Sequence, residues 1–180
     1  AAATLTTSDA AIVSATTVTT GTLSVAGNAV VSSGAVGAST MTVTTGTISI
    51  VGNLSVTAAQ TGTNTTGDAT VSVSTGRIDV TGTVTVTGGA VAGQVATLSV
   101  TGASAAGQGI NIGGALNIVS GVAGTATVNA NVAGARITVN GAGGVSNEDT
   151  LNIGAGTFSV TNAAATLTTS DAAIVSATTV

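Results

Sequence analysis

The sequence predicts an all-β protein built as a β-solenoid, in which short strands stack coil upon coil. Three observations support this prediction: one segment occurs twice letter for letter, a short motif returns along the whole chain, and the composition is dominated by Thr, Val, Ala, Gly and Ser. Gly is scattered throughout and no apolar stripe of period 3.6 persists, so helices are not expected. A β-sandwich repeat is the alternative fold, because it also needs many short alternating strands.

The repeated segment is AAATLTTSDAAIVSATTV, which forms both residues 1–18 and residues 163–180. An identity of this length does not arise by chance, even in so biased a composition. We therefore expect residues 1–162 to be one complete copy of a tandem repeat and residues 163–180 to be the start of the next copy. Tandem copying would cover the unpaired strand edges that the ends of a solenoid otherwise expose.

The shorter motif is clearest when Thr17–Asn28 (TVTTGTLSVAGN) is set against Thr42–Asn53 (TVTTGTISIVGN), where nine of twelve positions are identical. An aliphatic residue alternates with Ser, Thr, Asp or Asn until Gly or Asn follows, which predicts a short strand ended by a turn. The same frame returns at Val73–Thr83. It also returns, with fewer positions retained, at Thr97–Gly102, Ala115–Val119, Arg136–Gly141 and Thr157–Asn162.

The first large apolar residue of each motif is expected to be a core anchor. These anchors are Leu23, Ile48, Ile78, Leu98, Leu116, Ile137 and Phe158. Their spacings of 25, 30, 20, 18, 21 and 21 residues predict about seven to nine coils per 162-residue copy. One such coil cannot bury its own apolar face, so neighbouring coils must cover it.

The strings GTLSVAGN, GTISIVGN, TVTVTG and ATLSVTG resemble the β-helical passengers of large bacterial surface exoproteins. Filamentous haemagglutinin-like adhesins and autotransporter passengers are the families concerned. The resemblance covers the whole copy and rests on composition and a short motif. It implies a right-handed parallel β-helix displayed outside the cell, although this chain departs from those families in its near-complete lack of Lys and aromatic residues.

Charge excludes several classes of partner. Arg77 and Arg136 are the only cations against six carboxylates, which gives a net charge of −4. Two cations cannot neutralise a run of phosphates, so neither nucleic acid nor anionic lipid is expected to bind. Thr, Ser or Gly interrupts every apolar stretch before it reaches the roughly 18–20 residues of a membrane span. The expected partner is the protein itself, as a homopolymer or tandem array.

The composition also argues against catalysis. No His, Lys or Cys is present, so a Ser or Thr nucleophile would lack its usual base. Asp68 and Asp79 are expected to be solvated carboxylates, because the aromatic platforms of sugar-processing clefts are missing. We therefore expect no enzyme activity, no cofactor and no small-molecule substrate.

Three further polar features have a functional and a structural interpretation. Asn147, Glu148 and Asp149 form a cluster of oxygen ligands that could hold Ca²⁺, or a polar turn between coils. Arg77 and Asp79 flank Ile78 and should both point outward, where they could form an ion pair within one coil or between coils. Several Thr-x-Thr runs resemble the threonine ranks of ice-binding solenoids, or simply reflect a good strand former: Thr20/Thr22, Thr42/Thr44 and Thr83/Thr85/Thr87.

The function expected from the sequence is therefore structural. We expect an extracellular tandem-repeat β-solenoid that self-assembles into, or forms, a filament, sheath or fibrous layer on the cell surface. The alternatives are an adhesin stalk that presents a separate tip domain, and an ice-binding solenoid.

Overall fold

The structure is a computed structural model. It describes residues 5–7, 12–15, 21–35, 37–63, 66–101, 109–119, 121–129, 136–139, 143–145, 150–160, 167–169 and 174–179, with side chains described between 22 and 139. All regular structure in these residues is β-strand, and every pairing between the strands is parallel. The β-sandwich alternative is therefore wrong, because Greek-key sandwiches pair their strands antiparallel.

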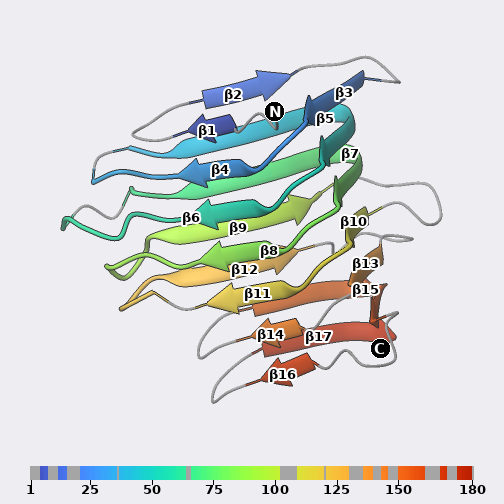
Figure 1. Ribbon diagram of the computed structural model, residues 1–180. Coiled ribbons are helices and arrows are strands. Elements are labelled where there is room, and N and C mark those ends of the chain that lie inside the picture. Colours follow the sequence, from blue (N-terminus) through green and yellow to red (C-terminus); the bar gives the residue numbers. More distant parts are fainter. Residues whose placement is uncertain are drawn as a thin grey trace.

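One sheet has seven strands, ordered β1-β4-β6-β8-β11-β14-β16. Its strands are β1 (Leu5–Thr7), β4 (Ala29–Ser32), β6 (Leu54–Thr57), β8 (Val84–Thr87), β11 (Leu116–Val119), β14 (Gly143–Val145) and β16 (Leu167–Thr169). The spatial order follows the chain order, so each strand lies between those laid down before and after it (Figure 1).

The other sheet has ten strands. They are β2 (Ile12–Ala15), β3 (Gly21–Val25), β5 (Ser39–Ile50), β7 (Ala69–Val80), β9 (Val95–Val100), β10 (Gly109–Ile112), β12 (Thr125–Asn129), β13 (Arg136–Val139), β15 (Thr150–Val160) and β17 (Ile174–Thr179). The long strands β5 and β7 bend in the middle, where Gly46 and Gly76 have φ of 136° and 137°, a conformation that favours glycine.

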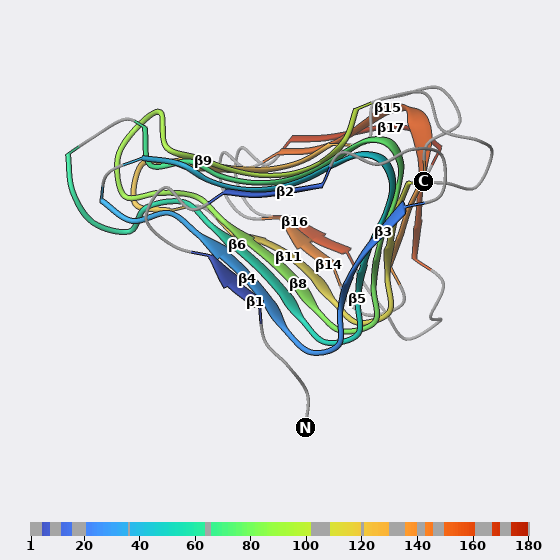
Figure 2. The same cartoon turned by 90° about the horizontal axis from the view of Figure 1, so that it is seen from above.

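This bend divides the ten-stranded sheet into two walls. The first wall contains β2, β9, β12, β17 and the first parts of β5, β7 and β15; the second wall contains β3, β10, β13 and the last parts of the same long strands. Viewed from above, the two walls and the seven-stranded sheet lie on three sides of a roughly triangular outline (Figure 2). The chain passes along the seven-stranded sheet, the first wall and the second wall in turn, and we call one such passage a circuit.

The register fixes the length of each circuit. One column of the seven-stranded sheet contains Leu5, Ala29, Leu54, Val84, Leu116, Gly143 and Leu167. Their spacings are 24, 25, 30, 32, 27 and 24 residues, so 162 residues make six circuits. The expected number of seven to nine is corrected to six. Leu116 and Ile137 lie in the same circuit, Leu116 in the seven-stranded sheet and Ile137 in the second wall. The motif spacing in the sequence counted them as two separate coils.

The interior is lined by columns of aliphatic side chains. The second wall aligns Leu23, Ile48, Ile78, Ile110, Ile137 and Phe158 in one column. Ile48, Ile78, Ile110 and Ile137 have no exposed surface, and Leu23 is partly buried against them. The side chain of Phe158 lies outside the described residues.

Two of the expected anchors belong to other columns. Leu98 pairs with Val71 in the first wall, and Leu116 pairs with Val84 in the seven-stranded sheet. Both side chains are buried. Ile110 takes the place between Ile78 and Ile137 that the sequence frame left empty. No helix in the described part of the chain is long and apolar enough to cross a membrane.

Candidate assembly site

A corner of constant length joins the second wall to the seven-stranded sheet. In the described circuits it consists of residues 26–28, 51–53, 81–83 and 113–115, and we call it the three-residue corner. Its middle residue is always glycine, and these glycines form a hydrogen-bonded column. The amide of Gly52 donates to the Gly27 carbonyl (2.9 Å), that of Gly82 to Gly52 (3.0 Å) and that of Gly114 to Gly82 (2.9 Å).

Asparagine side chains extend this column in the three-residue corner. The Asn28 side-chain oxygen accepts a hydrogen bond from the Asn53 amide at 2.9 Å, and the Asn53 oxygen accepts one from the Thr83 amide at 2.8 Å. A Cβ atom at Gly52 would clash with the Asn28 oxygen, and one at Gly82 would clash with the Asn53 oxygen. The Gly-Asn pairs that sequence analysis read as turn signals thus link one circuit to the next. Asn53, which also begins a glycosylation sequon, has this structural role.

The corner between the seven-stranded sheet and the first wall differs in length from circuit to circuit. It spans residues 33–38, 58–68, 88–94 and 120–124, and we call it the variable corner. Side-chain contacts within the loop hold it, together with hydrogen bonds between circuits, such as that from the Ala90 amide to the Ala59 carbonyl (2.8 Å). The Ser33 hydroxyl donates to the Gly37 carbonyl (2.6 Å), and the buried Gln94 accepts from the Val91 amide (2.9 Å). The role of Gln94 could not be predicted from the sequence, because a single glutamine in a loop carries no pattern.

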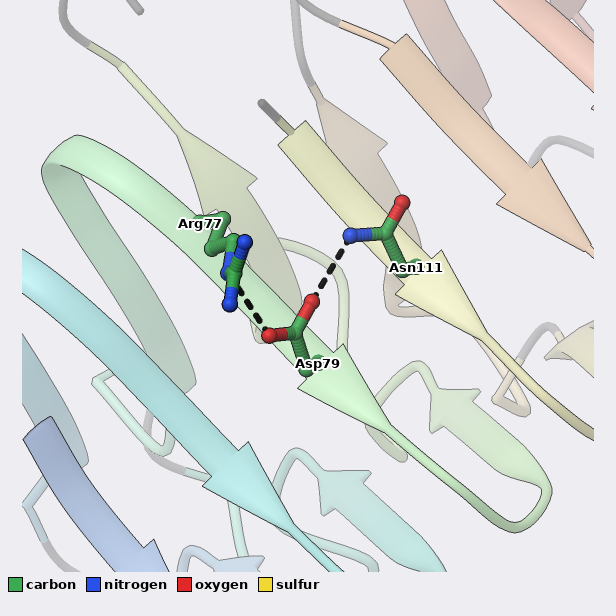
Figure 3. Close-up of polar contacts among 3 residues, drawn as sticks. All are labelled: Arg77, Asp79 and Asn111. Atoms are coloured by element: carbon green, nitrogen blue, oxygen red, sulfur yellow. Dashed lines mark hydrogen bonds and ion pairs between the residues drawn. The ribbon is translucent and has the colours of Figure 1, made fainter. Parts of the chain in front are cut away.

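Polar side chains meet on the outer face of the second wall (Figure 3). Arg77 Nε lies 2.7 Å from Asp79 Oδ2, and Asn111 Nδ2 donates to Asp79 Oδ1 at 2.7 Å. Asn111 comes from the next circuit and pairs with Asp79 in register. The arrangement is an ion pair within one strand extended to its neighbour, and the side chains of Arg77 and Asp79 are 50% and 32% exposed.

The other charged candidates are not gathered into a site. Asp68 accepts a hydrogen bond from the Val95 amide at 2.8 Å and so links two circuits at the variable corner. Asn147, Glu148 and Asp149, the possible Ca²⁺ ligands, lie outside the described residues, and nothing in the structure bears on them. The described residues contain no group of three acidic side chains that could hold a metal ion.

The Thr-x-Thr runs do not share one face. Thr42 and Thr44 lie in the first wall, whereas Thr85 and Thr87 lie in the seven-stranded sheet and Thr22 lies in the second wall. A different threonine row is present instead. Thr40, Thr70, Thr97, Thr127 and Thr150 occupy one register column of the first wall, on successive circuits.

Comparison with known proteins adds no assignment: no protein-family model, curated protein or solved structure matches the chain. The geometry of the described residues therefore carries the functional argument. It provides stacked parallel ladders, corners that hydrogen-bond circuit to circuit, and buried side-chain polar atoms that all have partners. These features hold one circuit against the next within the described part of the chain.

Proposed function

We propose that this chain is an extracellular structural protein: a right-handed β-solenoid of tandem 162-residue copies that forms a cell-surface filament, sheath or fibrous layer. Its partner is itself, and its mechanism is the stacking of backbone ladders into a stiff rod. The resemblance of its motifs to β-helical surface exoproteins supports the location outside the cell.

One observation carries the proposal. Interior strands such as β6 and β8 pair on both edges with the neighbouring circuits, in unbroken parallel register. Each buried residue in a column, such as Ile78 between Ile48 and Ile110, is therefore covered by neighbours from other circuits. Stability in such a stack is a sum over units and interfaces, so the structure lengthens by adding circuits and has no built-in size.

Low charge suits this role. The chain has only two cations and six carboxylates, and Thr and Ser are abundant in its sequence. A surface with so few charged residues promotes association between molecules, which is a liability for a soluble monomer and useful in a fibrous layer. Small side chains also let neighbouring rods approach closely.

The test is electron microscopy and diffraction of the chain and of a protein with two tandem copies. Six circuits per copy predict that each added copy lengthens the rod by about 29 Å, with a repeat of about 4.8 Å along its axis. Lateral contacts of regular spacing between rods would support a filament or layer. Compact particles strung like beads would overturn the solenoid.

The threonine row of the first wall supports ice binding as a second candidate function. The row presents threonine at one position of five successive strands, which are spaced about 4.8 Å apart. The adjacent outer row contains Thr42, Ser72, Ser99 and Asn129, so the regular array is one residue wide. Thermal hysteresis that falls in Thr70→Leu, and not in Thr85→Leu on the seven-stranded sheet, would support this function; no hysteresis would remove it.

A further inference from the structure

The same 18-residue sequence supplies the outermost strands of the seven-stranded sheet and of the first wall at both ends of the stack (Figure 1). Residues 1–18 contain β1 and β2, and residues 163–180 contain β16 and β17. We propose that this segment is the joint between chains: residues 163–180 of one chain pair with β4 and β5 of a second chain, in the place that residues 1–18 of the second chain otherwise occupy. We call this second chain the next copy. This rests on the proposed function, because it takes the circuits to be units of an extendable stack.

The strand edges are complementary. In the seven-stranded sheet β1 uses the edge that faces β4, whereas β16 uses the edge that faces β14. Because the two strands have one sequence and lie at opposite ends, the edge left open by β16 is equivalent to the edge that β1 uses. The same holds in the first wall, where β2 pairs with β5 and β17 pairs with β15. One segment can therefore pair with the last circuit of one copy and the first complete circuit of the next.

The register of the joint follows from the two sets of pairs. Leu5 pairs with Ala29, and Leu167, its equivalent, pairs with Gly143. At the joint Leu167 pairs with Gly143 on one edge and with Ala29 of the next copy on the other. In the first wall Ile174 likewise takes Thr150 and Thr40 of the next copy, since Ile12 pairs with Thr40.

The interior stays continuous across such a joint. Ala29, Leu54, Val84 and Leu116 form one buried column, each 1% exposed or less. Its register continues to Leu5 at one end and through Gly143 to Leu167 at the other. The strands β1, β2, β16 and β17 contain no charged residue, and the sequence has no proline. Charged residues and proline are the features with which sheet edges usually block association. Because these strands contain neither, their edges can pair with another copy.

Competition within one chain decides when the joint forms between chains. In the 180-residue chain residues 1–18 already occupy the edges of β4 and β5. An attached segment competes at an effective concentration of about millimolar, so a second molecule rarely displaces it. Weakening residues 1–18 alone should open the acceptor while leaving the donor intact.

The test uses matched substitutions in the full chain. Leu5→Asp with Val13→Asp places charges at the column positions of β1 and β2, which opens the acceptor. Leu167→Asp with Val175→Asp makes the same change in the donor. We expect the acceptor-open variant to assemble, with a molar mass by light scattering of at least about three times that of one chain, because a head-to-tail contact generates open filaments. The donor variant and the four-substitution variant should remain single chains.

Two outcomes of this experiment would overturn the joint. Equal assembly of the acceptor-open and four-substitution variants would mean nonspecific edge association, and no assembly of the acceptor-open variant would mean that residues 163–180 do not bind there. Adding the peptide of residues 163–180 should also cap the filaments, and the peptide with both Asp substitutions should not. If diffraction still gives the repeat of about 4.8 Å while assembly fails, the joint is wrong and the stacked rod stands.

A second measurement keeps the original strands intact. The sequence has no cysteine, so Val30→Cys with Thr168→Cys introduces the only thiols. Chains refolded at millimolar concentration and then oxidised should form covalent multimers, and chains refolded at micromolar concentration should not. Thr85→Cys with Thr168→Cys, which lies two circuits out of register, is the control. Equal cross-linking of both pairs would contradict the register.

Discussion

The two described kinds of corner both connect strands of different sheets, but they differ in length and in the contacts that hold them. The three-residue corner has one length in every described circuit, a central glycine, and hydrogen bonds that run from each circuit to the next. The variable corner ranges from five residues at 120–124 to eleven at 58–68, and contacts within the loop, such as Ser33 to Gly37, hold it in addition to hydrogen bonds between circuits. Circuit lengths can therefore differ while the register of the strands stays constant; part of the difference lies at the variable corner and part between the first and second walls, where residues 101–108 separate β9 from β10.

This difference indicates which part of the sequence determines how successive circuits align. The glycine column and the Asn28 and Asn53 side chains fix the relative height of successive circuits, and a Cβ in the column has no room. The variable corner adds or removes residues at its exposed tip, where loop length has a small entropic cost. Insertions in a chain of this kind should collect at the variable corner and between the first and second walls, and should be rare at the three-residue corner.

The largest predicted difference in the free energy of unfolding is between a charge placed in the buried column beside the three-residue corner and a charge placed at the exposed variable corner. Ile78 is 0% exposed, whereas Val122 is 89% exposed. Ile78→Asp buries an unpaired charge and should lower the free energy of unfolding by about 3–5 kcal/mol. Val122→Asp should change it by less than about 0.5 kcal/mol. Denaturant unfolding measures both, and an unchanged midpoint for Ile78→Asp would contradict the assignment of interior and exterior faces.

An insertion tests the two corners directly. Two glycines placed between Thr81 and Gly82 break the hydrogen bonds of Gly82 to Gly52, Gly114 to Gly82 and Thr83 to Asn53. At about 1 kcal/mol each, this should cost about 3 kcal/mol. The same insertion between Thr61 and Gly62, in the exposed part of the variable corner, should cost less than about 0.5 kcal/mol. Equal losses at the two sites would show that the variable corner also sets the register.

Sequence patterns predicted the regular part of this architecture well. The frame that aligned Leu23 with Ile48 and Ile78 is the register of the strands, because the corner between them keeps its length and its Gly-Asn signal. The frame failed after Ile78. Alternation of aliphatic and polar residues is the same on all three walls, so it could not tell Leu98 of the first wall from Ile110 of the second.

The candidate site was harder to predict from the sequence than the fold was. Identity of residues 1–18 and 163–180 indicated a repeat, but complementarity of strand edges depends on spatial order, which pattern alone does not give. The threonine row of the first wall was missed for the same reason. Thr40, Thr70 and Thr97 are neighbours across strands and lie 30 and 27 residues apart along the chain.

A smaller effect is expected from the asparagine of the three-residue corner. Asn53→Ala removes the oxygen that accepts from the Thr83 amide and should cost about 1 kcal/mol, since this amide is exposed enough to bond to water instead. Asn53→Asp keeps an acceptor oxygen of the same shape and should retain most of the stability. If the two variants lose equal stability, the hydrogen bond does not hold the corner.

The smallest effect should come from the ion pair of the second wall, which is remote from the register set by the corners. Arg77→Ala removes the contact to Asp79, but the Arg77 side chain is half exposed and solvent screens the pair. The free energy of unfolding should fall by only about 0.2–1 kcal/mol, and the difference should vanish in 1 M salt. Asp79 keeps its hydrogen bond from Asn111 in this variant, so the link between circuits survives. A loss that persists in high salt would mean that the Arg77 stem packs on the wall, and register would then depend on the outer face as well as on the corner.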